Sequence, residues 1–196
     1  LPILIALPFL GSIITAAMPR YGAARAPAAV AGGIALFALL SAIFLYSSVK
    51  GGAVIKYDVE WLPQLGLNFT LRLDAFAWMF IILITGIGFL VVLYARYYMS
   101  AEDPIPRFFA FFLAFMGSML GIVLSGNVIL LSIFWEMTSI FSFLLIGYWH
   151  NNATARDGAR MALTVTGIGG FCLLAGLLVL GHMAGSYDLD AIIAKG

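Results

Sequence analysis

The chain has 196 residues, of which 63% are hydrophobic and 10% are charged, and its formal net charge is +1. A soluble domain is typically about 45–50% apolar and about 25% charged, so this chain has too few polar side chains to cover a soluble fold. A net charge this close to zero gives no reason to expect a nucleic-acid partner. The composition therefore indicates an integral membrane protein.

Six apolar stretches approach or exceed the length of about 20 residues that a helix needs to cross a bilayer. In chain order they are Leu1–Met18, Ala28–Val49, Ala75–Ala95, Phe108–Ser125, Asn127–Trp149 and Met161–Ala184. We do not interpret the first as a signal peptide, because it has no basic leading segment and contains Pro2 and Pro8. The sequence thus predicts an all-α integral membrane protein with about six transmembrane helices.

The connections between these stretches indicate how the helices are joined. The polar segment Lys50–Asp74 contains an alternating run, Asn68 to Leu73, which predicts a short extended or hairpin piece at the membrane interface. The link Ser125–Asn127 is so short that the fourth and fifth helices should form an antiparallel pair. The remaining tail, Gly185–Gly196, is short and polar.

Basic residues are divided unevenly between the two sides of the predicted membrane. The loops at 19–27, 96–107 and 150–160 hold Arg20, Arg25, Arg96, Arg107, Arg156 and Arg160. The opposite side holds Lys50, Lys56, Arg72 and Lys195, mixed with acidic residues. Since cytoplasmic loops carry an excess of Lys and Arg, these three loops are predicted to be cytoplasmic and the N-terminus to lie outside. Arg156, Asp157 and Arg160 are interpreted first as anchors at the lipid headgroups.

Glu136 is the one acidic residue inside the six stretches. It follows Asn127 by nine residues, which places it about 13 Å into its helix and near the bilayer midplane. A carboxylate there costs about 2.5–3.5 kcal/mol on insertion scales, so its presence suggests a function. Burial favours the neutral form of a carboxyl and a nearby cation favours the charged form, and a proton relay uses this balance. The alternative is a glutamate that stays protonated or is locked in a structural ion pair.

Small hydroxyl residues accompany the acid. Ser132, Ser139 and Ser142 share a stripe of the helix with Glu136, where they can bond the acid, admit water or let another helix approach. The other candidates for lining a proton path are Thr164, Thr166 and His182. Threonine more often bonds its own helix backbone, and His182 is interpreted first as an interface residue.

The last apolar stretch is rich in small residues, which are interpreted as close helix packing. No Lys or Arg falls inside any of the six stretches, so either Glu136 is neutral or its cation comes from other residues or subunits. The sequence shows no metal-ligand spacing, nucleophile triad or phosphate-binding loop, and we expect neither a metal nor a cofactor.

The segment Phe134–Trp149, which reads FWEMTSIFSFLLIGYW, resembles the antiporter-like subunits shared by respiratory complex I and the multisubunit cation/proton antiporters of the Mrp type. Leu65–Phe80, Phe108–Glu136 and Ala153–Gly170 match in the same order. In complex I the sixth helix usually reads Thr-Arg-Val-Gly-Asp, where Thr166–Gly170 reads Thr-Gly-Ile-Gly-Gly. The resemblance is therefore greater to the large A subunit of the Mrp type.

The resemblance implies that Glu136 pairs with a lysine on a later, broken helix, and that further Lys or His residues carry protons at mid-membrane. It also implies two inverted five-helix repeats after a three-helix lead-in. Residues 1–107 would then be the lead-in and residues 108–196 the first three helices of the first repeat, so the chain looks like the N-terminal part of a larger subunit.

The function implied is that of a secondary transporter subunit, not an enzyme, which exchanges Na⁺ or another monovalent cation for protons across the cell membrane. Its partners would be the other antiporter subunits and the later helices of the same subunit. Two alternatives stay open. One is a proton-pumping subunit of complex I, and the other is a scaffold subunit that conducts nothing itself.

Overall fold

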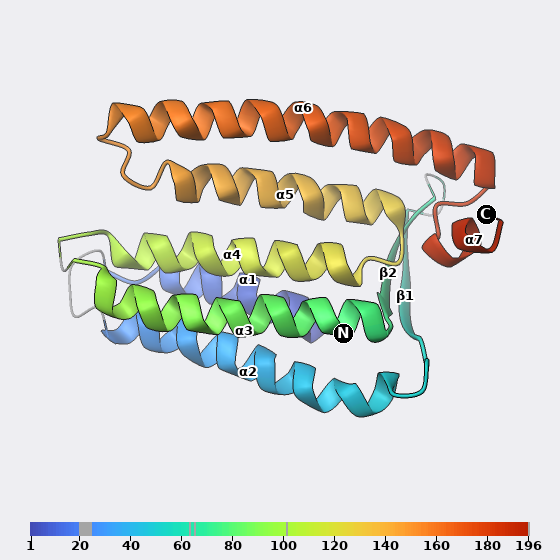
Figure 1. Ribbon diagram of the computed structural model, residues 1–196, viewed down its shortest axis with the longest axis horizontal. Coiled ribbons are helices and arrows are strands. Elements are labelled where there is room, and N and C mark those ends of the chain that lie inside the picture. The colour runs from blue at the N-terminus through green and yellow to red at the C-terminus, as the bar shows by residue number, and fades with distance from the viewer. Residues whose placement is uncertain (20–24, 63, 65, 101, 196) are drawn as a thin grey trace.

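The computed structural model describes residues 1–19, 25–62, 64, 66–100 and 102–195 (Figure 1). Arg20 and the side chain of Arg25, which entered the predicted orientation, lie outside this description. The elements in chain order are α1 (Pro2–Ala16), α2 (Arg25–Val49), β1 (Ile55–Leu62), β2 (Leu67–Leu73), α3 (Ala75–Tyr98), α4 (Ile105–Leu124), α5 (Val128–Ile146), α6 (Ala153–Ala184) and α7 (Leu189–Lys195).

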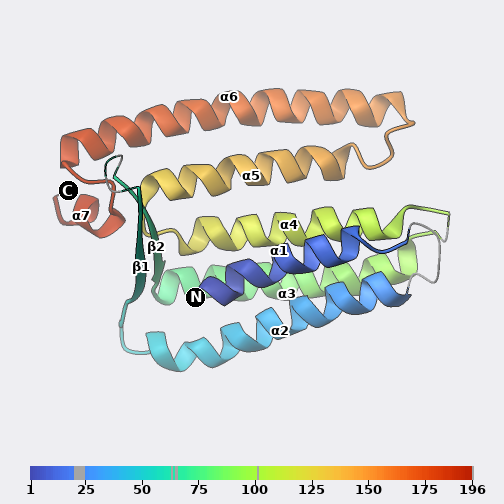
Figure 2. The same ribbon diagram turned by 180° about the vertical axis from the view of Figure 1, so that it is seen from behind.

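Long apolar helices packed side by side make up most of the molecule (Figures 1 and 2). Within the described residues five of them, α2 to α6, are long and apolar enough to cross a membrane. The apolar helix α1 has 15 residues and is about 22 Å long, less than the hydrocarbon core of about 30 Å. The prediction of an all-α membrane protein with about six apolar helices is confirmed, with the first helix short of spanning length.

Helix α4 lies inside the bundle, where α1, α3 and α5 pack against it. Its Phe109, Leu113 and Leu120 are fully buried. A Cβ atom at Gly121 would lie 2.3 Å from Cδ1 of Phe134, so the glycine is what lets the α5 aromatic ring sit against the α4 backbone. Close approach of this kind is how helices pack in lipid, where no hydrophobic effect drives them together.

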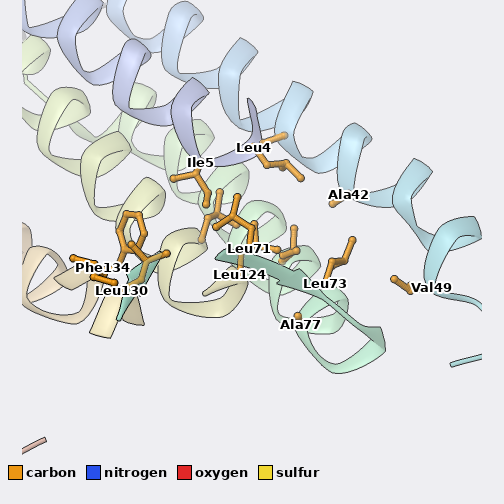
Figure 3. Close-up of a cluster of buried hydrophobic side chains, with 14 residues drawn as sticks. Leu4, Ile5, Ala42, Val49, Leu71, Leu73, Ala77, Leu124, Leu130 and Phe134 are labelled. Carbon is orange, nitrogen blue, oxygen red and sulfur yellow. The ribbon is translucent and has the colours of Figure 1, made fainter. Parts of the chain in front are cut away.

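A two-stranded hairpin closes one end of the bundle. The strands β1 and β2 pair antiparallel, from Ile55 with Leu73 to Leu62 with Leu67. Figure 3 shows Leu71 and Leu73 of β2 within the same buried cluster as side chains of α1, α2, α4 and α5. The predicted hairpin piece is confirmed, and its apolar face caps the ends of the helices.

The turn between α4 and α5 is attached to this hairpin. The backbone N–H of Gly126 donates to the Thr70 carbonyl at 2.8 Å. The Asn127 side chain accepts from the N–H groups of Ile129 and Leu130, which caps α5, and its amide donates to the Gly66 carbonyl at 2.8 Å. The antiparallel α4–α5 pair predicted from the short link is confirmed.

Two boundaries differ from the sequence prediction. Helix α6 begins at Ala153, not Met161, because Asn152 caps it and charged residues such as Arg156 are tolerated in a helix beyond the hydrocarbon core. The predicted loop 150–160 is therefore a short connection followed by the first turns of α6. The polar tail also contains a helix, α7, which lies beside the hairpin (Figures 1 and 2).

Candidate functional site

Glu136 lies close to the middle of α5, which runs from Val128 to Ile146. Helix α5 packs against α4 on one side and α6 on another (Figure 1). The carboxylate oxygen Oε1 of Glu136 is buried, and no hydrogen-bond partner for it exists in the described part of the chain. Buried polar atoms are nearly always hydrogen-bonded in folded proteins, so an unpartnered carboxyl oxygen at mid-helix calls for a functional explanation.

The residue that faces this carboxyl is Gly170 of α6. A Cβ atom built at Gly170 would lie 1.7 Å from Glu136 Oε1 and 2.8 Å from its Cδ. The carboxyl group thus occupies the volume that any other side chain at this position would fill. The same construction at the neighbouring Gly169 meets nothing within 4 Å. Of these two glycines, only Gly170 leaves the space that the Glu136 carboxyl occupies, and we call this space the niche at Gly170.

The sequence identified Gly170 only as one of several small packing residues. The signal that singles it out is the sequence Thr166–Gly170 itself, where the resembling complex I helix ends on Asp and this chain ends on Gly. A second carboxyl at this place would meet Glu136 directly. The position at which this chain differs from the complex I pattern, Gly170, is therefore the position that contacts the Glu136 carboxyl.

The serines of the predicted stripe lie on α5 next to Glu136. Ser132 and Ser139 are buried, and their hydroxyls donate to the carbonyls of Val128 at 3.2 Å and Trp135 at 3.4 Å. Ser142, farther along the helix, is half-buried. Because the two buried hydroxyls donate to their own helix backbone, they leave the Glu136 carboxyl without a donor.

The remaining predicted residues lie away from the acid. Thr164 and Thr166 are exposed on α6 and donate to the carbonyls of Arg160 and Ala162. His182 is exposed near the far end of α6, about 18 Å along the helix from Gly170. It lines a polar cavity of 440 Å³ at the hairpin end. The structure brings Ser132, Glu136, Ser139 and Gly170 together and leaves His182 apart, and the roles of all these residues stay predictions.

The charged residues gather at the two ends of the bundle. At the hairpin end, Asp190 pairs with Lys56 and accepts from Arg72 at 2.7 Å. At the other end, Arg160 lies 3.7 Å from Asp157. No ion pair found among the described residues includes Glu136. The same residues contain no cluster of His, Cys, Asp and Glu that could hold a metal ion.

In the part of the chain that the structure describes, the Glu136 carboxyl is positioned by packing and not by a fixed hydrogen bond to its buried oxygen. Its buried oxygen has no fixed donor among the described residues, and the α6 backbone lies against it at Gly170. The fold and this site define an integral membrane protein with a buried acid among its spanning helices.

Comparison with known proteins gives the same class. Residues 61–109 match the family described as NADH-ubiquinone oxidoreductase (complex I), chain 5 N-terminus. Residues 125–195 match the family described as NADH:quinone oxidoreductase/Mrp antiporter, TM. The chain belongs to this antiporter-like family of membrane subunits.

Individual relatives narrow the assignment. The chain is 60% identical over 196 residues to the probable K⁺/H⁺ antiporter A/B subunit of Rhizobium meliloti, covering 100% of this chain and 20% of that one. It is 41% identical over 157 residues to the Na⁺/H⁺ antiporter A subunit of Alkalihalophilus pseudofirmus, covering 77% of this chain and 20% of the relative.

A solved structure agrees with these sequences. The Mrp complex from Dietzia sp. superposes with a TM-score of 0.84 at 27% identity, covering 97% of this chain and 20% of the matched chain. The predicted resemblance is thereby confirmed, and the chain corresponds to an N-terminal portion of the Mrp-type A subunits. It spans about one fifth of the length of these relatives.

Proposed function

We propose that this chain forms part of a subunit of a multisubunit monovalent cation/proton antiporter, in which Glu136 carries the proton. The observation that carries the proposal is the buried, unpartnered oxygen of Glu136 in the niche at Gly170. An ionisable side chain inside a membrane bundle is costly, and proton transfer is a function that repays the cost.

The names of the relatives bear on the exchanged cation. The relative at 60% identity is named for K⁺, and the relative at 41% identity is named for Na⁺. The sequence prediction favoured Na⁺, and the higher identity makes K⁺ the first cation to test. No second acid lies at mid-helix in the chain, so we place the path of the metal cation elsewhere in the complex.

The complete assembly would supply what this site lacks. We assign residues 1–107 to a lead-in and residues 108–196 to the start of the first antiporter-like repeat. Later helices of the same subunit would bring a lysine or another cation to Glu136. Other antiporter subunits are the partners, the cell membrane is the location, and the N-terminus lies outside with the arginine-rich end in the cytoplasm.

The test uses inverted membrane vesicles that contain the complete complex. A proton gradient is formed, K⁺ or Na⁺ is added, and the loss of the gradient is compared between the wild type and Glu136→Gln at equal complex content. Glutamine fills the same volume but cannot titrate, so exchange should be abolished. Glu136→Asp should keep partial activity, because its carboxyl sits one methylene short.

The composition of the complex is checked by purification of each variant. If Glu136→Gln assembles and still exchanges cations for protons, the acid is structural and the chain serves as part of a scaffold. If neither cation dissipates the gradient in the wild type while another proton-coupled activity is present, the complex I alternative is favoured.

A further inference from the structure

Residues of α4, α5 and α6 line a cavity at the arginine-rich end of the bundle. This end of the helices lies opposite the hairpin (Figure 1). The volume of the cavity is 310 Å³. Arg107 of α4, Arg156 and Arg160 of α6, and Tyr148 and His150 of the α5–α6 connection line it. The proton site at Glu136 does not use any of these residues, so the cavity requires an explanation of its own.

The charge of the cavity is strongly positive. Three arginines line it, and none of the described residues in its wall is acidic. Two acids lie nearby. Asp157 is 3.7 Å from Arg160, in a pair whose side chains are more than 70% exposed, where such contacts contribute little. Asp103 accepts from the Trp149 indole at 3.3 Å. Neither acid neutralises Arg107 or Arg156.

Two of the arginines are held in place by the connection that they surround. Arg107 donates to the Tyr148 carbonyl at 2.7 Å, and its guanidinium lies 5.1 Å from the centre of the Tyr148 ring. Arg156 donates to the His150 carbonyl at 2.8 Å. Each guanidinium has five N–H donors, so most of the donors of both arginines stay available to a ligand.

Two buried donors in this region lack an acceptor. Tyr148 is only 4% exposed, and its hydroxyl has no hydrogen-bond partner in the described chain. The same holds for the buried Nε of Arg107. Burial raises the pKa of Tyr148 to about 12, so the hydroxyl keeps its proton and can only donate or accept as a neutral group. Unpartnered donors beside three arginines suit a ligand with several anionic oxygens.

The rest of the wall is apolar and belongs to membrane-spanning helices. Phe111 of α4 and Phe143 of α5 contribute to it. At this end of the bundle, Trp149 and Tyr97 are exposed, as aromatic residues are at the level of the lipid headgroups. A ligand here meets positive charge at the interface and apolar surface toward the bilayer.

We infer that this cavity binds the phosphate group of an anionic phospholipid, with an acyl chain along the wall formed by Phe111 and Phe143. The recognised chemistry is a phosphate diester held by Arg107, Arg156, Arg160 and the Tyr148 hydroxyl. A phospholipid is favoured over free phosphate because the cavity joins the arginines to an apolar wall. Bound lipid would tie the connection between α5 and α6 to the membrane surface.

The experiment uses the complete complex in detergent and a photoreactive phosphatidylglycerol that carries its crosslinker in the acyl chain. Crosslinks are quantified on the peptides that contain Phe111 and Phe143. The variants are Arg156→Gln with Arg160→Gln, and Tyr148→Phe, which removes a single donor. Arg96→Gln is the matched control, since Arg96 lies at the same end of the bundle and does not line the cavity.

Saturable crosslinking is expected in the wild type and in Arg96→Gln. The double arginine variant should weaken binding about 25-fold, at about fivefold for each arginine. Tyr148→Phe should weaken it less while the purified complex keeps its composition. Phosphatidylcholine should compete poorly.

Three results would overturn the inference. The first is equal crosslinking in the double arginine variant and the wild type, and the second is an equal loss in Arg96→Gln. The third is displacement of the lipid by inorganic phosphate as readily as by unlabelled phosphatidylglycerol, which would mean that the site takes the free anion.

Discussion

The two helices on either side of α5 differ sharply in their surroundings. Of the 20 residues of α4, 12 are buried, whereas only 4 of the 32 residues of α6 are buried. Helix α4 is enclosed by α1, α3 and α5, whereas α6 packs chiefly on α5 and turns residues such as Phe171 and Val165 outward. One is an interior helix and the other is an edge helix.

Glu136 lies on α5, between the interior helix α4 and the edge helix α6. Its own helix is fixed against the interior by the contact of Phe134 with Gly121, and its carboxyl faces the edge helix at Gly170. An acid enclosed by α4 would be inaccessible to an incoming group, and an acid on the outer face of α6 would contact lipid. The Glu136 carboxyl thus combines a backbone fixed against the interior with a position against the edge helix α6.

The largest effect that tests this comparison is expected from Gly170→Ala. The new Cβ would overlap the Glu136 carboxyl, which is the end of a flexible side chain, so the carboxyl moves and the helices stay in place. A displacement of about 1 Å at a reacting group can cost about a hundredfold in rate. We expect cation/proton exchange to fall at least about tenfold with normal assembly.

Gly169→Ala is the matched control, because its Cβ would meet nothing within 4 Å. Exchange and assembly should both stay at the wild-type level in this control. Equal exchange in the two alanine variants would show that the Gly170 contact does not position the acid.

The next effect compares the N-caps of α5 and α6. Asn127 and Asn152 each cap a helix, but Asn127 is 3% exposed and also donates to the Gly66 carbonyl. Replacing either by alanine removes a cap worth about 1 kcal/mol. Asn127→Ala also removes the hydrogen bond to the half-buried Gly66, at a further cost of about 0.5–1.5 kcal/mol.

Hydrogen exchange of the complete complex measures this difference. Amides in the first turn of α5 and in β2 should lose protection in Asn127→Ala, while Asn152→Ala should affect only the first turn of α6. If both variants change only their own helix, the turn between α4 and α5 does not depend on the hairpin in the way the hydrogen bonds indicate.

The smallest effect concerns pH and the contact between the hairpin and α7. The hydrogen bond from Lys56, and then that from Arg72, lowers the pKa of Asp190, and the Asp190 carboxylate raises the pKa of Lys56. The stabilisation from Asp190 is therefore complete above its unfolded pKa of about 3.9 and is lost as the pH falls through the lower folded value. The stabilisation from Lys56 is complete below about 10.4 and is lost as the pH rises through the higher folded value.

Both side chains are more than a third exposed, at 34% and 41%, so the effect is less than about 1 kcal/mol. Protection of α7 and β1 amides, corrected for intrinsic exchange, should be constant between about pH 4 and 10 and decrease outside this window. Asp190→Asn should remove the decrease in amide protection at low pH. Asp157→Asn, at the other end of the bundle, should leave it unchanged.

The helices could be predicted because membrane-spanning length and hydropathy are local properties of the chain. The hairpin followed from the alternation in Asn68–Leu73 for the same reason. The start of α6 was missed because the hydrophobic stretch begins at Met161, whereas the cap at Asn152 lies two turns earlier, beyond the apolar segment. Charged residues indicate where a helix leaves the hydrocarbon core, but the helix itself can continue beyond that point.

The acid could be singled out from the sequence, but its contact could not. Glu136 stands out because charge is rare in an apolar stretch. Gly170 lies on another helix, and its difference from the complex I pattern marks the position without showing what it contacts. Only the packing of α5 on α6 shows that Gly170 faces the carboxyl. His182 looked equally polar in the sequence, and its distance along α6 separates it from the acid.

The most direct measurement is the infrared difference spectrum of the complete complex in lipid, recorded as the cation or proton gradient is reversed. If Glu136 carries the exchanged proton, the wild type shows a protonated-carboxyl band that rises and falls with the gradient and is absent in Glu136→Gln. An unchanged band in Glu136→Gln would mean that the moving proton sits on another group and that the niche at Gly170 holds a static acid.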